Sequence, residues 1–263
     1  MKRAPIHVLI FLGFGGSQLF AQNPGQRISV DIRIDSVTVR GDTIGVASVV
    51  TNRSTSQESL LFYLVDEPSG VVTIRRPTSA PGTKWYPSRD FRSRPMAVWS
   101  VLGNQLAPNA ASPQLFFESI GVPGIVQYWA GGKFPLPTNE DATDSALVND
   151  PLTTEMITGS TVGVSPWPVD RTPAGLLARL RTLTRSTCSA PLRWLTDSSL
   201  CTQLLSDIDQ ADAYRSAGQT AEAKRTLTHY SGLLGSANSY APGVTSSAYW
   251  LLKVNADIIN AML

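Results

Sequence analysis

The sequence has few of the residue types that catalysis and metal binding use most. Its 263 residues include two histidines, His7 and His229, and two cysteines, Cys188 and Cys201. Only 16% of the residues are charged, against roughly 25% in an average globular protein. A metal site built from several histidines is therefore excluded, and zinc would lack its usual ligands. We predict a protein that is not an enzyme, with no catalytic residue, no metal and no cofactor.

Long apolar runs are also missing after the N-terminus, so we predict no transmembrane span in the mature chain. Residues 1–21 have the layout of a secretory signal peptide: Lys2 and Arg3, then the apolar stretch Ile6 to Phe14, then Leu19-Phe20-Ala21 as a cleavage site. An anchor that is never cleaved is the alternative. We expect a secreted or periplasmic protein.

The expected mature chain lacks a net charge of either sign. Removal of Lys2 and Arg3 from the 22 basic residues leaves 20, which equals the number of acidic residues. Nucleic-acid binding needs a concentrated basic surface. We therefore predict no nucleic-acid partner.

Short apolar segments separated by Gly, Pro and Asn fill residues 22–134. Ile28 to Ile34 alternates apolar and polar residues, which is typical of a half-buried strand, and the phase shifts near Ser36, which indicates a bulge. Leu60–Val65 is a continuous apolar run that suits a sandwich interior. The pattern predicts an immunoglobulin-like β-sandwich.

The rest of the chain divides at residue 172. Residues 135–171 are acidic and Pro-rich, which indicates a linker. Residues 172–263 show helical periodicity with caps at Thr172, Thr220 and Thr245, and predict a four-helix module. In the last helix an apolar stripe from Ala248 to Met262 must pack on other elements. The fold class is therefore α+β in two domains, an N-terminal sandwich and a small C-terminal helical bundle.

The helical part resembles the FIMAH-type domain of secreted bacterial proteins over about 60 residues. The resemblance is carried by Leu204–Ala217, Gly218, Ala223-x-x-x-Leu227-x-x-Tyr230 and Ala248-x-x-Leu251-x-x-x-x-Ala256-x-Ile258-Ile259. Tyr230 stands where that family often has Phe. The resemblance implies an extracellular accessory module without known catalysis.

The N-terminal part is similar to an unassigned group of bacterial exported β-sandwich domains. The matching segments are Val49-Val50-Thr51-Asn52-x-Ser54, Trp85, Val98-Trp99-Ser100, Pro108 with Ser112, and Phe117-x-Ser119-x-Gly121-x-Pro123-Gly124-Ile125. Pro108-Asn109 replaces the usual Pro-Gly of that group. The resemblance implies an exported sandwich and no particular activity.

The two cysteines predict a structural disulfide between Cys188 and Cys201. In an exported protein two cysteines most simply pair, and these flank the connection between the first two predicted helices. A redox pair is the alternative, but it usually has Cys-x-x-Cys spacing.

A hydrolase is the least supported interpretation of the sequence. A Ser-His-Asp site would need His229, and the mature chain has no Gly-x-Ser-x-Gly motif. A glycosidase would need two converging carboxylates, and Asp66-Glu67 is the most notable pair. We interpret His229 as a surface or partly buried histidine of a helix and Asp66-Glu67 as a solvated turn.

Aromatic residues leave one binding function open. Exposed Trp85, Tyr86 and Trp129 would give a carbohydrate-binding protein, by analogy with other sandwiches that stack rings on sugars. The basic stretch Lys84 to Arg94 around Trp85-Tyr86 suits an acidic partner, although a solvated loop is the simpler interpretation. The favoured hypothesis is a non-catalytic protein with a binding or structural role at the cell envelope or outside the cell, with a protein or glycan partner.

Overall fold

The computed structural model of the chain describes residues 27–78, 83–91, 93–103, 105–132 and 156–263. The predicted signal peptide and residues 135–155 of the predicted linker lie outside these ranges. The strands of the first part are β1 (Val30–Arg40), β2 (Thr43–Asn52), β3 (Phe62–Asp66), β4 (Val71–Arg75), β5 (Thr83–Phe91), β6 (Arg94–Gly103), β7 (Leu115–Ile120), β8 (Val122–Gly131) and β9 (Ile157–Ser165). The later elements are α1 (Pro173–Cys188), α2 (Ser198–Ser216), α3 (Thr220–Leu233), the short β10 (Gly235–Ser236) and β11 (Ser239–Tyr240), and α4 (Ser246–Met262).

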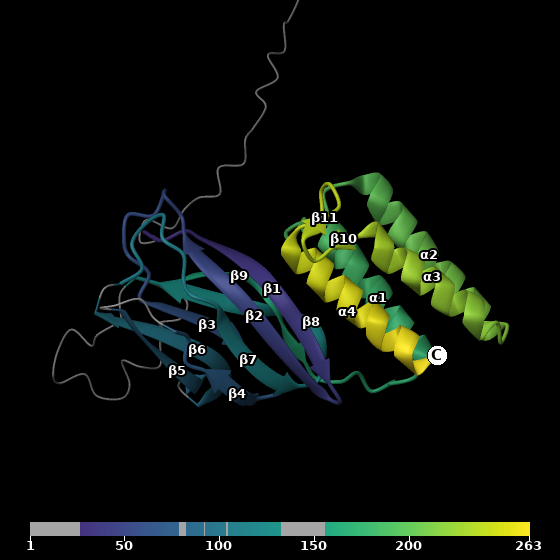
Figure 1. Cartoon of the computed structure of the whole chain (residues 1–263), viewed down its shortest axis with the longest axis horizontal. Helices are drawn as coiled ribbons and strands as arrows, with labels where there is room; N and C mark the ends of the chain where they lie inside the picture. The colour runs from purple at the N-terminus through teal and green to yellow at the C-terminus, as the bar shows by residue number, and fades with distance from the viewer. Residues whose placement is uncertain (1–26, 79–82, 92, 104, 133–155) are drawn as a thin grey trace, which may run out of the picture.

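Two antiparallel sheets form the β part (Figure 1). One has the strand order β1-β2-β7-β4 and the other β5-β6-β3-β8-β9. Alternating side chains from both sheets are buried in one cluster, which includes Ile34, Val46, Trp99 and Phe117. The predicted bulge in the first strand is confirmed, since the pairing of β1 with β2 shifts register between Ile34 and Ser36.

Strand β9 corrects the predicted linker. Residues 157–165 pair with β8 along the whole strand, from Ala130 with Ile157 to Val122 with Ser165. The sequence ITGSTVGVS carries little alternating hydrophobicity, yet Thr161, Val162 and Val164 are buried. The second half of the linker is therefore an edge strand of the five-stranded sheet.

The four predicted helices are present, with two of the three predicted caps. The Thr172 hydroxyl accepts a hydrogen bond from the Gly175 backbone, and the Thr245 hydroxyl accepts one from Ala248. Thr220 is not a cap but the first residue of α3, which begins after Gln219 with no side-chain cap. Among the described residues, no helix is both long and apolar enough to cross a membrane.

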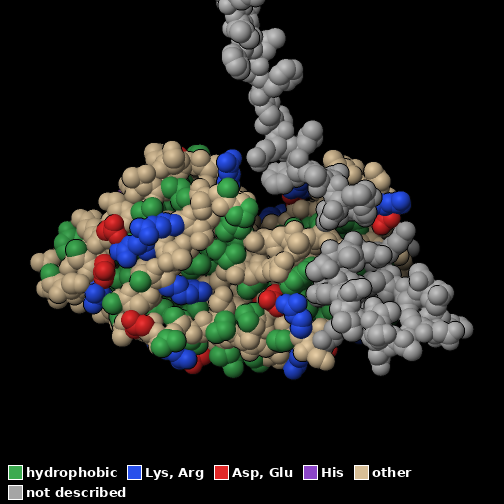
Figure 2. Space-filling view, turned by 180° about the vertical axis from the view of Figure 1, so that it is seen from behind, with side chains coloured by type: hydrophobic (Ala, Val, Ile, Leu, Met, Phe, Trp, Pro, Cys, Tyr) green, Lys and Arg blue, Asp and Glu red, His purple; other side chains and the backbone are tan. Residues whose placement is uncertain are grey.

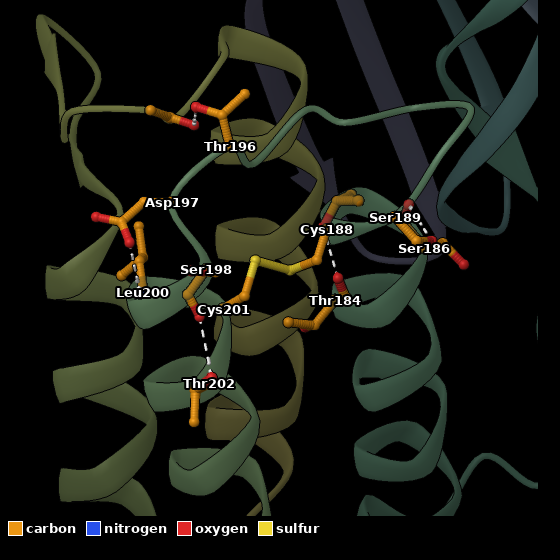
Figure 3. The surroundings of a disulfide bond; sticks show 12 residues. Thr184, Ser186, Cys188, Ser189, Thr196, Asp197, Ser198, Leu200, Cys201 and Thr202 are labelled. Carbon is orange, nitrogen blue, oxygen red and sulfur yellow. Dashed lines mark hydrogen bonds between the residues drawn. A yellow bond between two sulfur atoms is a disulfide. The ribbon is translucent and has the colours of Figure 1, made fainter. Parts of the chain in front are cut away.

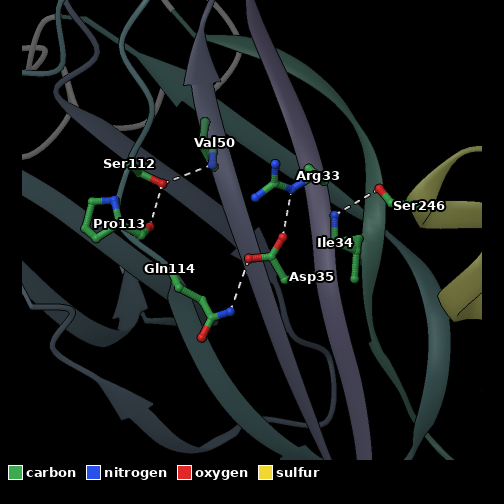
Figure 4. A network of polar contacts seen from close by, with 8 residues as sticks. All are labelled: Arg33, Ile34, Asp35, Val50, Ser112, Pro113, Gln114 and Ser246. Carbon is green, nitrogen blue, oxygen red and sulfur yellow. Dashed lines mark hydrogen bonds and ion pairs between the residues drawn. The ribbon is translucent and has the colours of Figure 1, made fainter. Parts of the chain in front are cut away.

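Helix α4 lies against the β part, nearest to β1, with β8 and β9 also in contact with it (Figure 1). At the start of α4, the Ser246 hydroxyl accepts a hydrogen bond of 3.1 Å from the Ile34 backbone of β1 (Figure 4). One cluster of buried side chains continues from the sheets into all four helices. The helical part is therefore docked on the β part rather than carried by a free linker.

A half-buried arginine strengthens this junction. Both terminal nitrogens of Arg179 in α1 donate to the Pro123 carbonyl of β8 at 3.0 Å, and Nη1 also donates to Asn255 Oδ1 of α4 at 2.7 Å. Asn255 Nδ2 donates to the same carbonyl at 3.1 Å. Burial lowers the pKa of Arg179 to about 10, so the guanidinium is still charged at neutral pH. These bonds satisfy a charge that would otherwise be costly to bury.

The predicted disulfide is confirmed. Cys188 at the end of α1 is bonded to Cys201 in the first turn of α2, with a Cα–Cα distance of 6.2 Å (Figure 3). Beside it, the Asp197 carboxylate caps α2 by accepting from the backbones of Ser199 and Leu200. The bond thus closes the loop between two helices that pack together.

Candidate functional site

A groove lies where the C-terminal half of α4 passes the β1–β2 hairpin. It has a volume of about 720 Å³ and is lined mainly by apolar side chains. Val37 and Val39 of β1 form one wall, and Val254, Ile258 and Met262 of α4 form the other. We call it the α4–β1 groove.

The groove exists because the apolar stripe of α4 is longer than the surface that covers it. Leu251, Leu252 and Ile259 are buried, as the sequence predicts. Met262 of the same stripe is 44% exposed, so the prediction that the whole stripe packs on other elements is wrong at its C-terminal end. The last turns of α4 therefore present apolar side chains to the groove.

A third wall comes from the chain segment between β9 and α1. Trp167 and Arg171 of this segment line the groove opposite Trp250 of α4. The Arg171 guanidinium stands 5.2 Å from the centre of the Trp167 ring. Within the described part of the chain, the indole N–H groups of Trp167 and Trp250 are both buried without a hydrogen-bond partner. The groove is thus framed by two indole rings and one stacked cation.

Exposed apolar side chains gather around this groove. Among the described residues six large hydrophobic side chains are exposed, and two of them, Val39 and Met262, line the groove itself. Val169 lies between Trp167 and Arg171 in the chain and is fully exposed, and Ile120 is paired with Thr43 beside the β1–β2 turn. Hydrophobic side chains are also visible across the middle of the molecule where helices and sheets meet (Figure 2). Apolar surface concentrated in this way is typical of a binding site.

The charged groups of the groove are few. Lys253 Nζ and Asp257 Oδ2 are 2.5 Å apart and neutralise each other. Asp42 at the β1–β2 turn and Arg171 also line the groove, and among the described residues neither has an ion-pair partner. Within the described ranges, the groove therefore offers apolar contact, one free cation and one free anion. These groups can bind a ligand.

The aromatic residues of the carbohydrate hypothesis are mostly inside the molecule. Trp85 is 1% exposed and Trp129 is 4% exposed, so the prediction that these rings face solvent is wrong. Trp85 belongs to strand β5 rather than to a loop, and its ring enters the core shared by the two sheets. Tyr86 is 37% exposed, and the guanidinium of Arg76 lies 5.3 Å from its ring centre. The structure leaves one of the three rings available to a sugar.

The basic stretch around these rings is not a loop. Lys84 and Arg89 lie in β5, Arg94 begins β6, and Arg92 is outside the described residues. Arg94 is 3.5 Å from Asp66 and lies over the Trp129 ring at 5.4 Å. Arg94 therefore already interacts with an acidic side chain of the protein itself, which argues against an acidic partner at the Lys84 to Arg94 stretch.

His229 is placed on the surface of the helical part. Its Nδ1 is 2.8 Å from Asp207 Oδ2, which joins α3 to α2, and its side chain is 57% exposed. This position agrees with the interpretation of His229 as a surface or partly buried histidine of a helix.

The Asp66-Glu67 turn differs from the prediction of a solvated pair. Glu67 is fully buried between the sheets, where Oε1 accepts a hydrogen bond of 3.3 Å from the Val164 backbone, and Oε2 has no partner among the described residues. Burial raises the pKa of Glu67 well above its usual value, and nearby Asp66 acts in the same direction. The hydrogen bond from the Val164 backbone opposes this shift but does not cancel it. The sequence shows no signal for this burial, because Asp66-Glu67 stands directly before Pro68-Ser69-Gly70, a pattern typical of an exposed turn.

Comparison with known proteins adds no assignment to these sites. The described residues contain no group of three or more His, Cys, Asp or Glu side chains that could hold a metal ion. No protein-family model matches this chain, and a search of curated proteins finds no match.

Proposed function

We propose that this protein is a non-catalytic exported binding protein and that the α4–β1 groove is its binding site. The observation that carries the proposal is the apolar groove of about 720 Å³ with exposed Val39 and Met262 in its walls. Such exposure costs solubility unless a ligand or partner uses it. A volume of this size is in the range of small-molecule sites.

Export is supported by the cysteine chemistry. A Cys188–Cys201 disulfide is stable in oxidising compartments and rare in the cytosol. We propose that the protein is secreted or periplasmic and that its partner is met there.

We also propose a family interpretation of the two parts. The N-terminal sheets are proposed as an immunoglobulin-like sandwich domain, and the helices as a FIMAH-type domain docked on it. Support comes from the antiparallel sheets with a shared core and from the burial of Leu204, Leu227 and Tyr230, which belong to the resembling pattern.

We expect export to leave a defined N-terminus. When the full chain is produced in a bacterium with a periplasm, N-terminal sequencing of the exported protein should begin at Gln22, because Leu19-Phe20-Ala21 is the cleavage site. Retention of Met1 in a membrane fraction would show instead an uncleaved anchor.

We expect the groove to bind an apolar fluorescent dye. The variant Ala261→Trp should weaken that binding by at least roughly tenfold, because this loss of affinity corresponds to one to two methylene groups that are no longer buried. Ala261 lines the groove and is exposed, so the larger ring fills the space without disturbing the core. Dye titration of the folded protein measures the effect. Ala213→Trp, at an exposed position of α2 outside the groove, is the matched control and should bind dye as the parent does. Absence of dye binding, or equal binding by both variants, would contradict the proposed site.

The carbohydrate alternative retains only Tyr86. A glycan array with the parent and Tyr86→Ala distinguishes this alternative from the groove. Glycan binding that is lost in the variant would place the binding site at β5 of the five-stranded sheet. Binding to no glycan leaves the groove as the site.

A further inference from the structure

We propose that the α4–β1 groove takes a single-chain amphiphile with an alkyl tail and a carboxylate head. This inference rests on the groove being the binding site, as proposed above. It assigns the chemical class of the ligand and the residue that holds its head.

The walls favour an alkyl tail. Val37, Val39, Val254, Ile258 and Met262 are aliphatic or flexible, and together they offer no directional polar contact. A methylene chain needs only burial and dispersion, and it can follow a groove bounded by a β-hairpin and a helix. The volume of about 720 Å³ exceeds what a single inserted side chain would occupy.

The charged side chains that line the groove favour a carboxylate head. Lys253 is already neutralised by Asp257, whereas Arg171 has no ion-pair partner among the described residues. A guanidinium binds a carboxylate through two parallel hydrogen bonds, and stacking of Arg171 on Trp167 limits its freedom in advance. Asp42 at the β1–β2 turn repels an anion. The head is therefore assigned to Arg171 and the tail to the aliphatic walls of the groove.

The test uses octanoate, decanoate and dodecanoate, each with the alcohol of the same length, titrated against the full mature protein below micelle formation. Binding is followed by tryptophan fluorescence, because Trp167 and Trp250 line the groove, and by calorimetry. We expect affinity to rise roughly fourfold for each buried methylene. We expect each carboxylate to bind roughly fivefold more tightly than its alcohol.

Two variants separate the tail from the head. Arg171→Gln should remove the preference for the carboxylate over the alcohol, because it removes the charge of an exposed side chain that lies outside the core. Ala261→Trp should weaken both ligands, and Ala213→Trp neither.

Three outcomes would overturn the amphiphile. The first is the absence of saturable carboxylate binding, and the second is equal affinity for the acid and the alcohol. The third is a concentration-dependent dimer that Ala261→Trp dissociates, because a second copy of the chain would then occupy the groove. If the apolar dye binds in the groove and carboxylates do not displace it, the ligand class is wrong and the proposed site stands. If the dye does not bind either, both fail.

Discussion

Loss of the Cys188–Cys201 bond is expected to destabilise the protein by about 3 kcal/mol. The bond closes a loop with a sequence separation of 13, and the chain-entropy model assigns this much to a loop of such length. The closed loop carries Leu195, which is buried and bridges to Val244 ahead of α4. Chemical denaturation with and without a reducing agent measures the change, and the melting temperature should fall by on the order of 10 °C.

A double variant controls for the effect of free thiols. Cys188→Ala with Cys201→Ala should match the reduced parent protein and should show no further response to the reducing agent. An unchanged denaturation midpoint in the reduced parent would contradict the stabilising role of the bond. Two free thiols in the exported protein would contradict the bond itself.

Replacement of Glu67 by Gln is expected to stabilise the protein above neutral pH by about 2 kcal/mol. Folding above neutral pH requires this carboxyl either to bury its charge, with one backbone hydrogen bond at Oε1 and no partner at Oε2 among the described residues, or to take up a proton. A penalty of about this size is typical of a poorly paired buried group, and Gln avoids it because it does not ionise. The amide side chain of the Glu67→Gln variant would keep the acceptor for the Val164 backbone and remove the ionisable group.

The pH dependence of this effect has a definite sign. Because burial raises the pKa of Glu67 in the folded state, its stability contribution is fully present below the ordinary pKa of 4.5. It is lost as the pH rises from there through the raised pKa of the folded protein. The difference in unfolding free energy between Glu67→Gln and the parent should therefore be near zero around pH 4 and grow toward pH 8, as proton linkage requires.

An exposed glutamate provides the matched control for this series. Glu222 pairs with Arg225 on the surface of α3 at 2.6 Å, so Glu222→Gln should change stability by at most about 0.5 kcal/mol at either pH. Denaturant titrations of the three proteins at about pH 4 and about pH 8 test the prediction. A constant difference between Glu67→Gln and the parent across this range would show that Glu67 does not ionise with a raised pKa.

Local patterns in the sequence were sufficient to predict the structural elements that depend only on residues close together in the chain. The alternation from Ile28 to Ile34 and the phase shift at Ser36 predict β1 and its bulge, because side chains of a strand alternate between faces. Thr172 and Thr245 predict two helix starts, because a cap acts within its own first turn. The disulfide follows from having only two cysteines in an exported chain.

Only the tertiary structure decided which of these surfaces are covered. Trp85 and Trp129 are buried, β9 joins a sheet in spite of a weak pattern, and Glu67 is enclosed between strands that are distant in the sequence. Met262 belongs to the same stripe as Leu252 but remains exposed, because α4 extends beyond the helices and strands that cover its first turns. Periodicity determines which side of an element is apolar, whereas burial depends on contacts between distant segments. The α4–β1 groove arises from that difference, so no local pattern predicts it.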